Sequence, residues 1–236
     1  LIKINYNSDN LLKIFIFNNT LFNYYHKIYS LLSKKFLSLK LIVYCSKIPF
    51  NEKFLPICDL PNIKVIYSET ISLEHNIVLP LFKGINFSVV NKNNIEIIDK
   101  VFEKNLIVKN HLLFASFNIK NGLVKSRCLA DDFLKKNNIV NFDFINYEEY
   151  LYNLSEYKFC ICPESLSINT YRIYECLCLR TIPICTKSVF TEYLKKKYPI
   201  LLLDKWEDLD LYSLNDFYKK SNWHNYDNLK LQNFLV

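Results

Sequence analysis

In the second half of the chain, short apolar runs alternate with longer stretches whose apolar residues recur at helical spacing. The short runs are rich in β-branched and aromatic residues, which is typical of buried strands, and the longer stretches are typical of amphipathic helices. The expected strands are 112–117, 142–145, 158–162, 181–185 and 200–203, and the expected helices are 123–136, 147–156, 170–179 and 189–197. This alternation predicts a parallel sheet with helices on both faces.

The first half of the chain shows a weaker pattern of the same kind. Strands are expected at 13–17, 41–44 and 63–67, and helices at 21–37 and 95–102. Leu79, Pro80 and Gly84 mark a break in the pattern. We therefore expect an α/β protein with two Rossmann-like lobes, the first at residues 1–105 and the second at residues 106–236.

Composition favours a folded protein and excludes two nucleotide-binding motifs. Hydrophobic residues make up 50% of the chain and aromatic residues 16%, which is enough for a sizeable core. The chain has only two glycines, Gly84 and Gly122, whereas the P-loop and the dinucleotide fingerprint each need at least two glycines close together. No apolar run approaches the roughly 18 residues of a membrane helix, so no membrane segment is expected. Because the chain does not begin with methionine, we expect a fragment or processed product with a truncated N-terminal lobe.

The formal charge of +7 is compatible with nucleic-acid binding, but the distribution of the lysines favours another interpretation. All but three of the 30 basic residues are lysines, and their short clusters fall at the ends of expected helices, where they complement the helix dipole. We expect no nucleic-acid partner. The three arginines are Arg127, Arg172 and Arg180, and each offers a planar pair of donors that lysine lacks.

Five of the eight cysteines lie between residues 160 and 185, which suggests zinc, but their spacing argues against it. Zinc motifs usually place two to four residues between neighbouring ligands. Cys160 and Cys162 are one residue apart and share a face of the expected strand, while Cys176 and Cys178 lie about 200° apart around the expected helix. We expect buried cysteines that act as small hydrophobes, no metal site, and no disulfide framework.

The candidate site lies where the expected strand 158–162 ends. The loop 163–169 leads from this strand into the helix that begins at Thr170, which Asn169 or Thr170 can cap. In doubly wound sheets, ligands bind beyond the carboxyl ends of the strands. The free N–H groups and the positive dipole of this helix start suit a phosphate group.

Arg172 lies in the first turn of this helix, and Glu175 follows three residues later on the same face. A guanidinium for phosphate and a carboxylate for a sugar diol suit a nucleotide ligand. The alternative is a surface ion pair, which is the common role of such spacing and contributes a few tenths of a kcal/mol.

Several short matches point to a family. A strand ends in Pro163-Glu164, and Asn169-Thr170-Tyr171-Arg172, Tyr174-Glu175-Cys176-Leu177 and Ile182-Pro183-Ile184 follow. This order resembles the exostosin-type glycosyltransferases (family 47 and its relatives, including those of large DNA viruses). That family has Pro-Arg/Glu-Gly, Gly-x-Asp-Thr-His/Tyr-Arg, Trp/Tyr-Glu-Ala-Leu and Gly-x-Ile-Pro-Val. Weaker matches at 75–84, 112–127 and 201–206 extend the resemblance to about residues 65–210.

The resemblance implies a GT-B architecture in which the C-terminal lobe binds a nucleotide-sugar, here a UDP-sugar, and the other lobe binds a glycan or protein acceptor. Glu175 would bind the donor ribose, Arg172 the diphosphate and Arg127 the leaving phosphate, and the loop from Glu164 to Asn169 would line the sugar. Transfer would invert the sugar's configuration by direct displacement, with no metal and no cofactor. The catalytic base is not assigned.

The chain departs from the family at several loop positions. Ser165 and Ser167 replace glycines, Asn169 replaces an aspartate, and Arg180-Thr181 replaces the glycine before Ile-Pro. Serine adopts positive φ less readily than glycine and keeps the backbone farther from a ligand. The alternative to an active transferase is therefore a nucleotide- or sugar-binding module that has lost catalysis.

Two further features leave other possibilities open. Asp208-Leu209-Asp210 has the Asp-x-Asp pattern of metal-dependent glycosyltransferases, although acids just before a helix also cap it. His75 lies near the expected crossover between lobes and is a candidate acceptor-side base, although a packed or surface role is the simpler interpretation. The compartment is also open: the Golgi lumen given an upstream anchor, or the host cytoplasm given a viral source.

Overall fold

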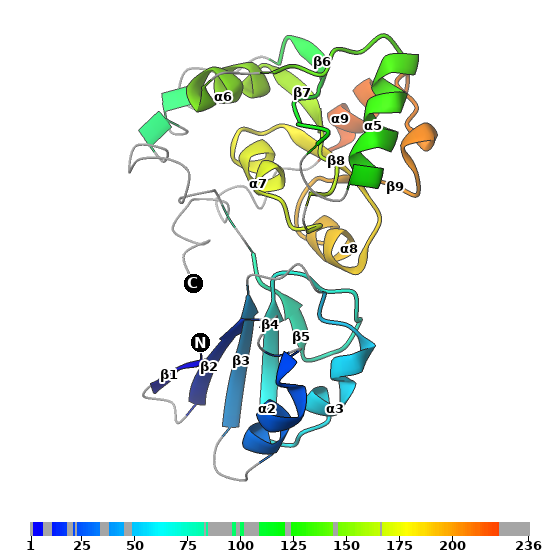
Figure 1. The fold of residues 1–236 in the computed structure, drawn as a ribbon. Helices are drawn as coiled ribbons and strands as arrows, with labels where there is room; N and C mark the ends of the chain where they lie inside the picture. Colours follow the sequence, from blue (N-terminus) through cyan, green and yellow to red (C-terminus); the bar gives the residue numbers. More distant parts are fainter. Residues whose placement is uncertain are drawn as a thin grey trace. The chain divides into compact units, whose positions relative to one another are not determined.

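Two sheets of mainly parallel strands form the framework of the protein in the computed structural model (Figure 1). The structure describes residues 2–6, 11–17, 21, 23–33, 38–44, 49–82, 84, 96–97, 100–101, 109–120, 124–143, 146–165 and 167–221. The chain divides into two compact units, Leu1–Phe82 and Lys83–Val236, and each contains one sheet. The predicted division after residue 105 falls outside the described residues and stays a prediction.

The first unit contains a five-stranded sheet in the order β1-β2-β3-β4-β5. Its elements are β1 (Ile2–Tyr6), β2 (Leu11–Phe17), α2 (Tyr25–Leu32), β3 (Ser38–Tyr44), η1 (Glu52–Phe54), α3 (Leu55–Cys58), β4 (Ile63–Ser68) and β5 (Val78–Pro80). β1 is antiparallel to β2, and all other neighbours are parallel. The strands expected at 13–17, 41–44 and 63–67 are confirmed as β2, β3 and β4, whereas β1 and β5 were not expected.

Local chemistry accounts for the helices of this unit. Ile28 and Leu32 are buried one turn apart on α2, which therefore packs through a single apolar stripe. The Asn51 side chain accepts a hydrogen bond from the Lys53 N–H and so caps η1. α2 is shorter than the expected helix 21–37, of which residues 22 and 34–37 are not described. Of the expected helix 95–102, the described residues 96, 97, 100 and 101 are helical.

The second unit contains a four-stranded, fully parallel sheet in the order β6-β7-β8-β9. Its elements are β6 (His111–Phe114), α5 (Val124–Lys136), α6 (Tyr147–Ser155), β7 (Tyr157–Ile161), α7 (Tyr171–Cys178), β8 (Ile182–Thr186), α8 (Val189–Lys195), β9 (Leu201–Leu203), η2 (Trp206–Asp208) and α9 (Leu214–Lys220). The expected alternation of strands and helices is confirmed here, within one or two residues at most ends. Each unit is thus an α/β layer structure compatible with a Rossmann-like lobe.

Both faces of the second sheet are buried, as expected of parallel strands. Phe159 and Ile161 on β7, with Ile182 and Ile184 on β8, join one core cluster that also contains side chains of α5 and α9. The intervening residues of these strands include Cys160 and face the other way, toward the layer that contains α7 (Figure 1).

The strand expected at 142–145 is wrong for the residues that the structure describes: 141–143 are irregular, and 144–145 are not described. The Phe142 N–H still donates to Ala115 O, just after β6. One residue earlier, the Asn141 amide accepts from Phe117 N–H and donates to Phe117 O, both at 3.0 Å. A side-chain amide thus replaces the backbone pairing that would have extended the sheet.

Two helices of the second unit end in the same way. Asn138 (φ 55°) follows α5 and Arg180 (φ 53°) follows α7, both in the left-handed region. After α7, Arg180 N–H donates to Leu177 O and Thr181 N–H to Cys176 O, which is the Schellman arrangement. Arg180 therefore takes the position where the resembled family has glycine and where glycine is conformationally preferred.

Lysines cluster at helix ends, as predicted. Lys135 and Lys136 lie in the last turn of α5, Lys195 in that of α8, and Lys219 and Lys220 in that of α9. The pair at 34–35 is not described. Within the described part of the chain, no helix has both the length and the apolarity needed to cross a membrane.

Candidate functional site

The loop between β7 and α7 places unpaired polar groups at the start of α7. Thr170 occupies the N-cap position, but its side chain makes no capping hydrogen bond, and its buried Oγ1 has no hydrogen-bond partner among the described residues. Asn169 lies one residue before the N-cap position, and its Oδ1 accepts a 2.7 Å hydrogen bond from the Tyr174 hydroxyl. The predicted side-chain cap by Thr170 is therefore wrong.

Arg172, the second residue of α7, has a buried Nε with no hydrogen-bond partner among the described residues. Burial acts to lower the pKa of its guanidinium, but nearby groups that include Tyr150, Cys160 and Glu175 outweigh burial, and the net shift is upward. Arg172 is therefore a cation at neutral pH. An unpaired donor on a buried cation is costly unless another group satisfies it.

Glu175 is bound by two tyrosines of α6. Its Oε1 accepts a hydrogen bond from Tyr147 and its Oε2 one from Tyr150, both at 2.9 Å. Its side chain is only 6% exposed, and no ion pair within 4.0 Å joins it to Arg172. The surface ion-pair interpretation of Arg172 and Glu175 is therefore wrong, since Glu175 is buried and its carboxylate binds the two tyrosines instead.

The net effect of this environment is to raise the pKa of Glu175. Burial raises the pKa, while Arg172 and the two tyrosine hydrogen bonds lower it by less. The pKa values of Tyr147 and Tyr150 are raised too, by burial first and then by the Glu175 carboxylate. Both phenols thus remain protonated donors. The two tyrosines were not among the predicted site residues, although their spacing of three places both on one face of α6.

Arg127 joins the loops that follow β6 and β7. Its Nη1 donates to Asn118 O at 2.5 Å, and its Nε donates to Glu164 O at 3.0 Å. Burial lowers its pKa, and the positive charge of Arg172 lowers it further, so the two guanidinium groups lie within electrostatic range of each other. The structure therefore brings the two predicted phosphate-binding arginines to one region.

The remaining predicted residue, Glu164, lies at the carboxyl ends of β7 and β8. Its Oε1 accepts a 3.3 Å hydrogen bond from Thr186 Oγ1 at the end of β8. Glu164 is half-buried, and its backbone carbonyl also accepts from Arg127. Side chain and backbone together fix the start of the loop that leads to Arg172.

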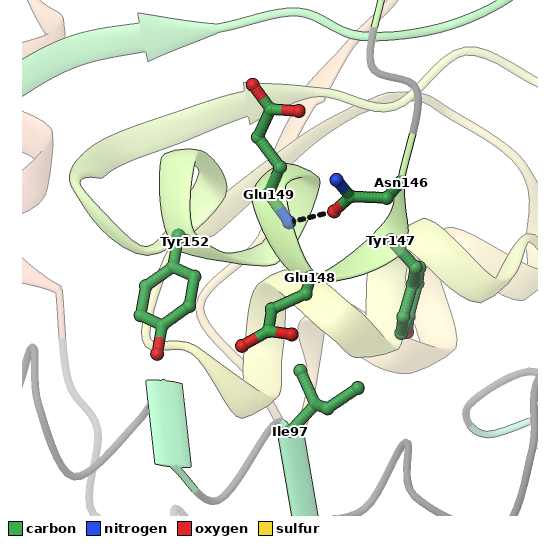
Figure 2. Close-up of a pocket in the computed structure, with 6 residues that line it drawn as sticks. All are labelled: Ile97, Asn146, Tyr147, Glu148, Glu149 and Tyr152. Atoms are coloured by element: carbon green, nitrogen blue, oxygen red, sulfur yellow. Dashed lines mark hydrogen bonds between the residues drawn. The ribbon is translucent and has the colours of Figure 1, made fainter.

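A pocket of about 560 Å³ opens beside the first turn of α6 (Figure 2). Its lining residues are Ile97, Asn146, Tyr147, Glu148, Glu149 and Tyr152. The Asn146 side chain caps α6 by accepting from Glu149 N–H at 2.7 Å, and the rings of Tyr147 and Tyr152 lie on either side of Glu148. Because the Tyr147 hydroxyl binds Glu175, this pocket and the buried carboxylate share one side chain.

Three cysteine sulfurs meet beneath α7. The Sγ atoms of Cys160, Cys162 and Cys176 all lie within 4.8 Å of one another, and all three residues are buried. Sequence spacing relates residues within one element, and the prediction that Cys160 and Cys162 share one face is confirmed. The proximity of Cys176 could not be predicted, because no spacing along the chain relates a strand to the helix that crosses it.

Two alternative site features have ordinary local roles in the described structure. Asp208 Oδ2 accepts from Lys205 N–H, and Asp210 Oδ1 accepts from Tyr212 N–H, so both carboxylates of the Asp-x-Asp pattern cap nearby backbone. His75 Nδ1 accepts from Ile77 N–H at 3.4 Å.

No protein-family model matches this chain, and the search of curated proteins finds no match either.

Proposed function

We propose that this protein is a glycosyltransferase that moves a sugar from a nucleotide-sugar donor, a UDP-sugar, to a glycan or protein acceptor. One observation carries the proposal: Arg127 and Arg172 lie within electrostatic range of each other, and Arg172 Nε is buried with no hydrogen-bond partner in the described part of the chain. Two neighbouring cations repel each other unless an anion lies close to both. A bound ligand with negative charge would supply that anion.

A diphosphate fits this arrangement better than a single carboxylate. The start of α7 offers backbone N–H groups and the positive end of a helix dipole. The buried Thr170 hydroxyl also lies there, and none of the described residues bonds to it. The loops after β6 and β7, which Arg127 joins, lie at the carboxyl ends of parallel strands, where ligands of such sheets bind. In this proposal Arg172 binds the diphosphate, and Arg127 stabilises the leaving phosphate.

Glu175 is assigned to the donor ribose. Each carboxylate oxygen has two acceptor positions, and the tyrosines use one on each oxygen. The remaining positions are available to a ribose diol. The proposal includes a GT-B arrangement in which the first unit binds the acceptor.

The chemistry needs positioning and charge stabilisation from the protein. The acceptor hydroxyl attacks the anomeric carbon, the bond to the diphosphate breaks with inversion, and the guanidinium groups stabilise the negative charge that develops on the leaving group. A charged hydrogen bond contributes about 1.5–3 kcal/mol. Losing one during transfer would slow the reaction by roughly ten- to a hundredfold.

Donor binding and turnover test the proposal separately. Binding of UDP and of a panel of UDP-sugars is measured by calorimetry for the wild type, Arg172→Ala, Glu175→Ala and the control Lys135→Ala, whose exposed lysine pairs with the buried Asp131 of α5. We expect at least tenfold weaker binding for the first two variants and no change for the control. Equal binding by all four proteins would overturn the site assignment. Transfer should not require added Mg²⁺ or Mn²⁺, and a requirement for either ion would favour the Asp-x-Asp alternative.

A binding module without catalysis is the second candidate, and the β7–α7 loop favours it. Ser167 and Asn169 stand where the resembled family has glycine and aspartate, both are buried, and each is engaged inside the loop: Ser167 Oγ donates to Asn169 O, and Asn169 accepts from Tyr174. Tight UDP binding with neither transfer nor donor hydrolysis would select this candidate.

A further inference from the structure

The face of the second sheet beneath α7 is lined with thiols. Strand alternation turns Phe159 and Ile161 into the core on the other side, which leaves Cys160 and Cys162 on the α7 side of β7. Cys176, in the second turn of α7, lies against these two cysteines. None of the three forms a disulfide.

The spacing of these sulfurs suits a metal ion. Cys162 Sγ and Cys176 Sγ are 3.7 Å apart, and all three sulfurs lie within 4.8 Å of one another. A Zn–S bond of about 2.3 Å in tetrahedral geometry separates neighbouring sulfurs by about 3.8 Å. A small rotation of Cys160 would therefore complete a three-sulfur site. Cys185 on β8 also neighbours Cys162 on this face.

We propose that Cys160, Cys162 and Cys176 bind one zinc ion as thiolates beneath α7. Thiolate sulfur selects soft or borderline ions such as Zn²⁺ over hard cations. Binding replaces three S–H bonds with three Zn–S bonds and releases three protons, with no change in oxidation state. Because this site can be detected without any donor, its failure is distinguishable from failure of the proposed transferase function.

The charge balance favours a divalent ion. Three thiolates and Zn²⁺ leave a net charge of −1, which is costly in an interior where all three cysteines are buried. Arg172 lies within electrostatic range of Cys160 and Cys162 and supplies one positive charge. A monovalent ion would leave one more negative charge, which this arginine could not offset.

The spacing rule that argued against zinc concerns ligands within one short motif. Here the ligands come from a strand and from a helix that crosses it, 14 residues apart in the case of Cys162 and Cys176. The fold therefore brings the three sulfurs together although their spacing along the chain is not that of a zinc motif. Cys178, two residues beyond Cys176, is absent from the three-sulfur cluster.

The experiment uses the full chain, purified without chelator and kept reduced under anaerobic conditions. Bound zinc is measured by mass spectrometry of the metal, and Cd²⁺ is titrated into the stripped protein while its thiolate charge-transfer absorption is followed. We expect one equivalent of either ion, about three protons released on binding, and three thiols protected from alkylation.

Matched variants distinguish the site from adventitious thiol binding. Cys162→Ala and Cys176→Ala should each lose the bound metal ion. Cys178→Ala, which replaces a buried cysteine on the same helix as Cys176, should keep it. Circular dichroism checks that each variant is folded. The proposal is overturned if the wild type binds no ion, or if Cys178→Ala loses as much metal as Cys162→Ala.

Discussion

The Tyr150 hydroxyl donates a 2.9 Å hydrogen bond to Glu175 Oε2, so the helix before β7 holds the carboxylate of the helix after it. Tyr147 does the same for Oε1. Both donors come from α6, and with one donor on each oxygen they fix the orientation of the carboxylate. Glu175 is thus held in position without a ligand. A binding group that is already ordered loses little conformational freedom when the ligand binds.

The first prediction concerns pH and Glu175. Its pKa is raised above the ordinary value of 4.5, chiefly by burial, so the folded protein retains this proton to higher pH than the unfolded chain. The stability from this group is fully present below about pH 4.5 and is lost as the pH rises through the raised pKa. We expect the wild type to gain stability relative to Glu175→Gln as the pH falls from 7 toward 5, measured by denaturant unfolding. The exposed control Glu207→Gln should show no such trend, and a trend of opposite sign would contradict the assignment.

The second prediction concerns the tyrosine donors. Tyr150→Phe removes a buried hydrogen bond to a carboxylate, so we expect a loss of about 1.5–3 kcal/mol in the free energy of unfolding. Tyr147→Phe should cost less because Tyr147 is only half-buried. Tyr212→Phe is the matched control, since Tyr212 is 95% exposed. Equal stability of Tyr150→Phe and the control would show that the Glu175 carboxylate does not depend on this donor.

The third prediction concerns Lys109, which joins two helix ends to β8. Its ammonium group donates to Ser155 O (2.5 Å), Leu179 O (2.7 Å) and Thr181 Oγ1 (2.9 Å). Lys109→Met leaves these acceptors without their donor, and we expect a loss of about 2–3 kcal/mol at neutral pH. The exposed Lys187→Met is the control.

Lys109 also carries a pH dependence of the opposite sign to that of Glu175. Burial lowers its pKa from 10.5 to about 7, so between these values the unfolded chain holds the proton and the folded chain releases it. Stability therefore rises with pH across that window. The difference between the wild type and Lys109→Met should follow this trend in unfolding experiments between pH 7 and pH 10.5. A constant difference would mean that Lys109 remains charged in the folded state throughout.

The fourth prediction concerns Asn138, at φ 55° after α5. Asn138 N–H donates to Lys135 O and Ile139 N–H to Leu134 O, the same Schellman arrangement that ends α7. Asn138→Gly keeps these backbone bonds and removes the steric cost of a side chain in the left-handed region, so we expect a gain of about 0.5–1 kcal/mol. Lys136→Gly, at the last residue of α5, should instead lower stability, by up to about 1 kcal/mol, because glycine is a poorer helix former than lysine. The melting temperatures of both variants check these signs.

The order of elements in the second unit was predictable because its signals are local. The apolar runs at β7 and β8, and the apolar stripe of α5, reflect periods of two and about 3.6 that neighbouring residues alone determine. Of the strand expected at 142–145, the described residues 142 and 143 are irregular, and the segment after β6 is bound instead by the Asn141 side chain. Local strand propensity carries no information about whether a side-chain amide takes the place of backbone pairing.

The candidate site was predictable only in part. The sequence pointed to Arg127, Arg172, Glu164 and Glu175, since arginines and carboxylates after strand ends are recognisable by type and place. It did not indicate that Glu175 binds two tyrosines rather than Arg172, because those contacts depend on α6 and α7 packing together on one face.

By itself, the sequence determined the α/β class, most strand and helix positions in the second unit, and the loop in which the candidate ligand groups lie, because each depends on residues close together in the chain. Only the tertiary structure decided which of those groups meet. Three features require each helix to pack over its strand at one particular position along that strand. They are the convergence of Cys160, Cys162 and Cys176, the proximity of Arg127 to Arg172, and the burial of Glu175. The position at which a helix packs along a strand is determined by side-chain packing across the whole sheet, and no local pattern specifies it.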